Sequence, residues 1–163
     1  MDFTIQLRQR EAKLAAALQA KLQLRDIYLF QCEATGAGPP LRTVEPVRVK
    51  AELDSELDHA DSSGVDYAVT LRVACDEPLA FHIYVTFLAR YRFGGRSKDA
   101  SKGELEAFRK SHAVLAVWPY LREFVQTVTA RMGFPTEPLP FLPFILQRTA
   151  NKRGLKAAAP TEL

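Results

Sequence analysis

The stretch LAFHIYVTFLARYRF, residues 79–93, indicates the architecture most directly. Its odd-numbered positions from Leu79 to Phe93 are all apolar, which is the period of two that a β-strand shows. Its even-numbered positions carry no full charge until Arg90. A strand with two such faces needs a cover on each side. One cover can be a helix of this chain, and we expect the other to come from a second subunit.

Three further strands are predicted before this one. In residues 65–75 the odd positions are again apolar, and in residues 47–54 apolar and charged residues alternate strictly. Residues 24–33 carry apolar groups on both faces, which indicates burial on two sides. The short turn at 76–78 joins two neighbouring strands into a hairpin. The pattern therefore predicts a four-stranded antiparallel sheet.

One helix is predicted before the strands in the sequence, and a second is predicted after them. Residues 5–22 carry a narrow leucine stripe, which we expect to pack on the parent domain or on a sister subunit. A second helix begins at Ser101, three residues before Glu104, with the spacing of a capping box. It runs to Met132, with a kink or restart expected around Trp118 and Pro119 because proline cannot donate a helical hydrogen bond. We expect Trp118 and Tyr120 to be core anchors at this kink.

The segment after this helix is both apolar and rich in proline. Gly133 is expected to end the helix in the left-handed conformation. Prolines then exclude a regular strand or helix until about Phe144, where a short C-terminal helix is predicted. The pattern of residues 134–146 is equally consistent with burial inside the fold and with a contact surface for another chain. The predicted fold class is thus α+β.

Composition excludes several classes of function. The 163 residues suit one domain, and their net charge of +3 is too small to indicate nucleic-acid binding. No apolar stretch or leader pattern suggests membrane insertion or secretion, so we expect a cytoplasmic protein. The cysteines and histidines do not have the spacing of metal ligands, and no phosphate-binding GxxxxGK[ST] loop is present. We therefore expect no metal, no cofactor and no enzymatic activity.

One motif resembles a known family. The stretch VWPYLREF at 117–124, followed by Gly133, Phe134 and Pro135, is similar to the signature of the SecB chaperones. That signature has an apolar residue and Pro-Tyr, then Arg-Glu early in a long helix, then Gly and Phe-Pro at the helix exit. Residues 24–28, 46–54 and 69–73 look like the first three strands of the family. The resemblance divides the chain into an extra N-terminal helix (1–21), a SecB-like domain (22–150) and a disordered tail (151–163).

The resemblance implies a fold and a function. SecB subunits have a four-stranded antiparallel sheet with the long helix on one face, and they assemble as a tetramer, a dimer of dimers. They hold unfolded polypeptide clients in apolar channels without using ATP. The client-binding positions implied here lie on the second strand and on the segment after the long helix: Val47, Val49, Ala51, Leu53, Phe134, Leu139, Phe141, Leu142 and Phe144.

Two features separate this chain from the export chaperone. SecB proteins are usually acidic where they contact the translocation motor SecA, whereas this chain is slightly basic, which argues against delivery to SecA. The extra N-terminal helix is similar to that of SecB-like chaperones dedicated to a toxin–antitoxin pair. A general holdase, an antitoxin-dedicated chaperone and an adaptor for one peptide motif remain as alternatives.

Overall fold

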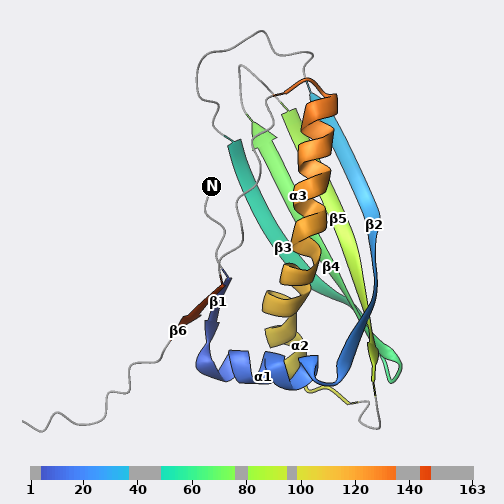
Figure 1. Ribbon diagram of the computed structural model, residues 1–163, viewed down its shortest axis with the longest axis vertical. Coiled ribbons are helices and arrows are strands. Elements are labelled where there is room, and N and C mark those ends of the chain that lie inside the picture. The colour runs from blue at the N-terminus through green and yellow to red at the C-terminus, as the bar shows by residue number, and fades with distance from the viewer. Residues whose placement is uncertain (1–4, 37–48, 76–80, 95–98, 135–143, 148–163) are drawn as a thin grey trace, which may run out of the picture.

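The sheet predicted from the sequence is present in the computed structural model, which describes residues 5–36, 49–75, 81–94, 99–134 and 144–147 (Figure 1). Its strands are β2 (Leu22–Gly36), β3 (Val49–Ala60), β4 (Gly64–Cys75) and β5 (Phe81–Phe93). They are antiparallel in the order β2-β5-β4-β3, so β2 and β3 form the two edges. The α+β fold class and the four-stranded antiparallel sheet are confirmed.

The two faces of the sheet differ in what covers them. The long helix α3 (Val114–Arg131) lies on one face, called here the inner face, where the ring of Phe87 contacts Tyr120 and Phe124. The odd-numbered residues of β4 and β5 point to this face and are almost all fully buried. The even-numbered residues form the outer face, which carries the polar pair Thr70 and Thr86 on the central strands. The predicted helix cover is thus present on one side.

The long helical region changes geometry earlier than predicted. Helix α2 (Lys102–Phe108) begins at the predicted capping box, with the Ser101 hydroxyl accepting from the Glu104 amide. A π-helical turn, η1 (Arg109–Ala113), then leads into α3. The helix does not restart at Pro119, because this proline lies inside α3. Burial of Trp118 and Leu121 on either side holds the helix together despite the missing hydrogen bond.

The N-terminal segment is a strand followed by a shorter helix. Helix α1 spans Gln9–Gln19, whereas β1 (Ile5–Arg8) occupies the start of the predicted helix. Ile5 and Leu7 are buried and alternate with exposed residues, which is the period of a strand. The backbone of β1 pairs in parallel with β6 (Phe144–Gln147).

This pairing also corrects the other end of the chain. Phe144, placed by the sequence at the start of a short C-terminal helix, lies in strand β6 opposite Ile5. A parallel ladder satisfies backbone donors and acceptors of β1 that would otherwise have no partner. Three predicted segments lie outside the described residues: the turn at 76–78, residues 135–143 of the apolar segment, and the tail at 151–163.

Candidate polypeptide-binding surface

Strand β3 presents the first part of the predicted client surface. Val49, Ala51 and Leu53 point to the inner face and are half-buried, while the residues between them are exposed on the outer face. These three residues, called here the β3 strip, pack at the margin of the core and not inside it. Val47 lies outside the described residues. A partly exposed apolar row along an edge strand is suited to contact another polypeptide.

Phe134 lies at the end of the sheet from which the β3 strip begins. Val49 pairs with Cys75, Cys75 pairs with Phe81, and the Phe81 ring contacts the ring of Phe134 at a centroid distance of 4.8 Å. The chain reaches this position through Gly133, whose φ of 77° confirms the predicted left-handed helix end. Phe134 is only 5% exposed, so its ring belongs to the core of the chain.

The remaining predicted positions cannot be placed in the same way. Leu139, Phe141 and Leu142 lie outside the described residues, and for Phe144 only the backbone pairing in β6 is described. Their role in client binding therefore stays a prediction. Among the positions that are described, the structure brings together the β3 strip and places Phe134 at one end of the same sheet.

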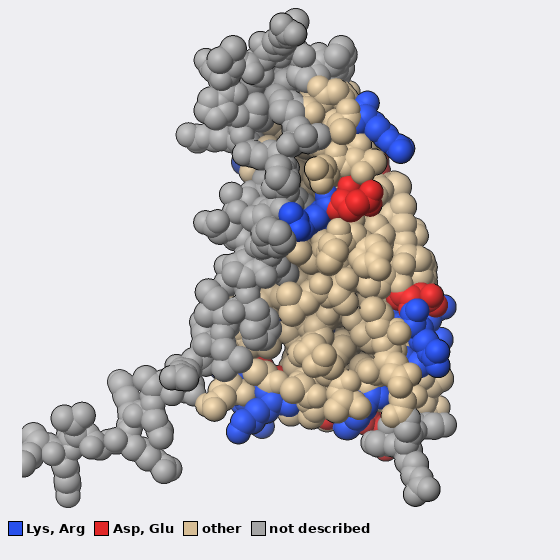
Figure 2. All heavy atoms as spheres, viewed as in Figure 1, with Lys and Arg blue, Asp and Glu red and all other residues tan. Residues whose placement is uncertain are grey.

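The other edge strand, β2, exposes apolar side chains that the sequence pattern predicts to be buried. Leu24 and Leu29 face the inner side, and Phe30 lies at a β-bulge between Leu29 and Gln31 with 61% of its surface exposed. These three residues are called here the β2 strip. The Leu29 backbone pairs with Phe87, whose ring contacts Tyr120, so the strip lies beside α3. Figure 2 shows few charged side chains over this face of the molecule.

Trp118 and Tyr120, both expected to be core anchors, differ in their exposure. Trp118 is 4% exposed and is a core anchor, as expected, whereas Tyr120 is 46% exposed and extends the apolar surface beside the β2 strip. The sequence signal that could have found this surface was the apolar pattern on both faces of residues 24–33. That pattern predicted burial on two faces, but register shifts in β2 place Leu24, Ile27 and Leu29 all on the inner face.

The outer face carries charged side chains beside the buried Ala68 and Leu88. Arg90 donates from Nε to Oδ2 of Asp66 at 3.2 Å and also contacts the Tyr28 hydroxyl, and the bond with Asp66 raises the pKa of the arginine. A cavity of about 360 Å³ lies further along this face, where Glu33, Arg72 and Glu52 occupy one cross-strand row with Tyr84. Charged side chains of both signs therefore line this cavity, together with Tyr84.

The histidines show no arrangement for catalysis or metal binding. His112 is half-buried, stacks on Phe108 and contacts the Ser111 hydroxyl through Nδ1 at 3.0 Å, and burial lowers its pKa. His59, near the end of β3, pairs with Asp61 at 3.2 Å, and both side chains are exposed. Within the described ranges, no group of His, Cys, Asp and Glu side chains could hold a metal ion. None of the helices described there has the length and apolarity to span a membrane.

The chain is similar in its fold to a known protein. No protein-family model matches the chain, and no curated protein matches its sequence. Among solved structures, the chain is similar to the SecB-like chaperone Rv1957 of Mycobacterium tuberculosis, solved in complex with a ChAD peptide from the antitoxin Rv1956 HigA1. The TM-score is 0.73 at 23% identity, over 82% of this chain and 99% of that one.

A second structure is less similar. A protein of unknown function from Streptococcus agalactiae gives a TM-score of 0.40 at 13% identity, over 74% of this chain and 98% of that chain. The similarity to Rv1957 assigns the fold: an α+β sheet-and-helix fold of the SecB-like chaperone type. The resemblance noted in the sequence is therefore confirmed at the level of the fold.

Proposed function

We propose that this protein is a chaperone that binds unfolded polypeptide without nucleotide, and that it is not an enzyme. The observation that carries the proposal is the half-buried β3 strip, which lies at the margin of the core in a SecB-like fold. Burial of apolar surface stabilises contacts by roughly 25 cal/mol per Å² without requiring a particular sequence. A row of this kind can therefore hold many unrelated apolar segments.

We further propose that the client is an antitoxin or a similarly aggregation-prone partner. The SecB-like chaperone of Mycobacterium tuberculosis was solved with a peptide from an antitoxin, which supports this alternative over export. The net charge supports the same alternative, because this chain is slightly basic and the export chaperone is usually acidic. The N-terminal helix, α1, also supports it, because it is similar to that of SecB-like chaperones dedicated to a toxin–antitoxin pair. Engagement of SecA is accordingly not part of the proposal.

The proposed assembly is a tetramer, a dimer of dimers, in which β2 contributes to the contact between copies. Exposure of the β2 strip and of Tyr120 supports this role, because large apolar side chains exposed together commonly mark an interface. The free edge of β2 can also pair its backbone with another strand. We propose a cytoplasmic location, in keeping with a client that has not yet folded.

A light-scattering assay tests the client-binding proposal. The protein in equimolar excess should suppress aggregation of a chemically denatured client in the absence of nucleotide. Ala51→Asp places a charge in the β3 strip, whose burial against an apolar client is costly, so suppression should be lost. Glu52→Gln changes the adjacent residue on the outer face and should retain it.

The outcomes separate the alternatives. If the wild type suppresses the aggregation of no client, the chaperone proposal is wrong. Suppression limited to an antitoxin encoded beside this protein would support the dedicated role. If Ala51→Asp suppresses as well as the wild type, clients bind elsewhere on the molecule.

A further inference from the structure

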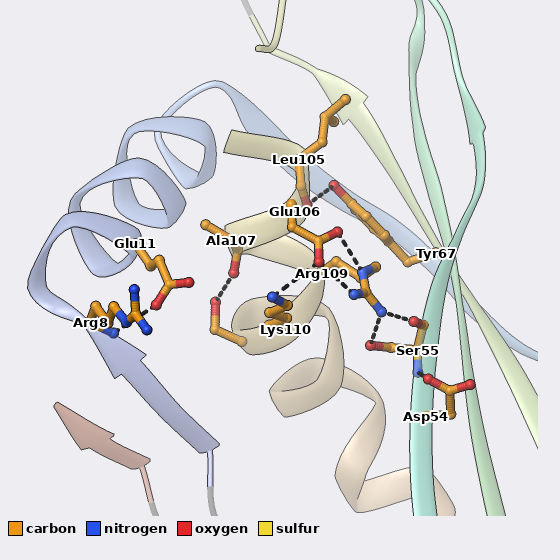
Figure 3. Close-up of polar contacts among 11 residues, drawn as sticks. Arg8, Glu11, Asp54, Ser55, Tyr67, Leu105, Glu106, Ala107, Arg109 and Lys110 are labelled. Atoms are coloured by element: carbon orange, nitrogen blue, oxygen red, sulfur yellow. Dashed lines mark hydrogen bonds and ion pairs between the residues drawn. The ribbon is translucent and has the colours of Figure 1, made fainter. Parts of the chain in front are cut away.

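Ser55 lies on the edge strand β3, and its backbone groups are occupied by side chains. Among the described strands, β3 pairs only with β4, so its other side has no strand partner. The Ser55 amide donates to Oδ1 of Asp54 at 2.7 Å, and its carbonyl accepts from Nη1 of Arg109 (Figure 3). The same Nη1 donates to the Ser55 hydroxyl at 3.1 Å. A second strand approaching at Ser55 would have to displace both side chains.

Arg109 is held in place from its own helical segment. Its Nε and Nη2 donate to the two carboxylate oxygens of Glu106 at 3.0 Å and 2.7 Å, a two-point contact that fixes the plane of the guanidinium. This ion pair raises the pKa of Arg109. The neighbouring Lys110 contacts the same carboxylate at 3.1 Å, and Figure 3 draws no polar contact from it to β3.

The segment that carries Arg109 is itself fixed against the sheet. The Tyr67 hydroxyl of β4 donates to the carbonyl of Leu105 at 3.2 Å. Arg109 begins the π-helical turn η1, where the helix repeat changes and the direction of the following side chains changes with it. The guanidinium therefore reaches the edge of β3 from a rigid support.

Without the Arg109 contact, the free edge of β3 would favour pairing with another chain. β3 is 12 residues long, with the apolar β3 strip and the exposed Leu57 on one face. Exposed edges of this length pair readily with strands of other molecules, and charged side chains on the edge are one of the ways in which proteins prevent it. Ser55 lies near the middle of β3, so a block there interrupts any long ladder.

We propose that the contact of Asp54 and Arg109 with Ser55 closes the β3 edge to a strand from another copy of this chain. Strand pairing between copies is then confined to the β2 edge, a consequence that rests on the assembly proposed above. The β3 strip stays available for side-chain contact, while open-ended growth of the sheet through β3 is prevented. The partner excluded at this edge is a second copy of the same chain.

Mass photometry across a range of protein concentrations tests this role. The wild type should give one closed assembly. Arg109→Met keeps the aliphatic stem but removes the guanidinium, so it should give concentration-dependent species of roughly twice the wild-type mass or more. Lys110→Met is the matched control, because it removes an ion pair to the same Glu106 without touching β3, and it should keep the wild-type mass.

A second variant tests whether the edge itself is responsible. Ser55→Pro removes the outward-facing amide, and proline is tolerated on edge strands for this reason. The double variant Arg109→Met with Ser55→Pro should return to the wild-type mass. A folded Arg109→Met protein with the wild-type mass at every concentration would overturn the proposal, as would larger species that the proline does not abolish.

A replacement variant and a comparison with the client assay complete the test. If Arg109→Met does not give a folded circular dichroism spectrum, Arg109→Lys replaces it, because lysine retains a charge near Glu106 but has no fork to reach Ser55. The wild-type mass for a folded Arg109→Lys protein would likewise overturn the proposal. If Arg109→Met increases the mass while the wild type suppresses no client aggregation, the edge role is supported and the chaperone proposal is refuted.

Discussion

Substitution of Phe30 by serine should separate assembly from protomer folding. Phe30 is 61% exposed at the β-bulge of β2, so most of its ring contributes nothing to the protomer core. In the proposed assembly this ring is buried against another copy. Phe30→Ser should therefore weaken the contact between copies much more than it weakens the fold.

The exposed fraction sets the size of the effect. Complete burial of a phenylalanine side chain contributes about 1.5–3 kcal/mol, so the exposed part of Phe30 accounts for about 1–2 kcal/mol per copy. A symmetric contact uses the residue twice, which gives about 2–4 kcal/mol and weakens pairing by roughly 30-fold or more. The part already buried in the protomer accounts for about 1 kcal/mol or less of its stability.

Analytical ultracentrifugation measures the dissociation constant, and thermal unfolding of the dissociated protomer measures the remaining stability. Gln31→Ser is the control, because Gln31 is the adjacent exposed residue and points to the outer face. A dissociation constant for Phe30→Ser equal to that of the wild type would refute the assignment of β2 to the contact between copies.

Two other substitutions test the core and the capping box. Phe108→Ala removes a ring that is 2% exposed and contacts Tyr67, Tyr91 and His112, and it should lower the free energy of unfolding by about 3–5 kcal/mol in urea titrations. A loss below about 1 kcal/mol would show that this aromatic cluster does not support the fold. The Ser101 amide and Lys21 lower the pKa of Glu104 to about 2, from 4.5 in the unfolded chain, so its contribution is fully present above pH 4.5 and is lost as the pH falls toward 2. The difference in melting temperature between wild type and Glu104→Gln should therefore be largest near neutral pH and shrink below pH 4.5, and a difference independent of pH would contradict this assignment.

The sheet and the long helix could be predicted because their signals are local. Alternation of apolar residues with period two is decided within each strand, and the capping box at Ser101 lies within four residues of sequence. The same alternation placed the β3 strip correctly on the inner face. Gly133 was identified because few other residues adopt a positive φ at a helix end.

Features that depend on distant partners could not be predicted. Ile5 was assigned to a helix because Leu7 fits the leucine spacing of α1, while its strand partner Phe144 lies near the opposite end of the chain. The cost of a proline within α3 is outweighed by the burial of Trp118, which local propensity does not express. No sequence signal marked the π-helical turn at Arg109 or its contact with Ser55.

The exposure of the β2 strip has a related cause. Strict alternation placed apolar residues on both faces of β2, whereas two register shifts, which a single sequence does not reveal, bring Leu24, Ile27 and Leu29 to the inner face. The same limit applies to Phe134, which the resemblance placed in the client surface and which packs against Phe81 in the protomer.

Hydrogen–deuterium exchange with and without a bound unfolded client shows whether clients bind along β3. Amide exchange along Val49–Ala60 should be slower when the client is bound, with the buried central strand Gly64–Cys75 unchanged. Client binding that leaves exchange in β3 unaltered would contradict binding at the β3 strip.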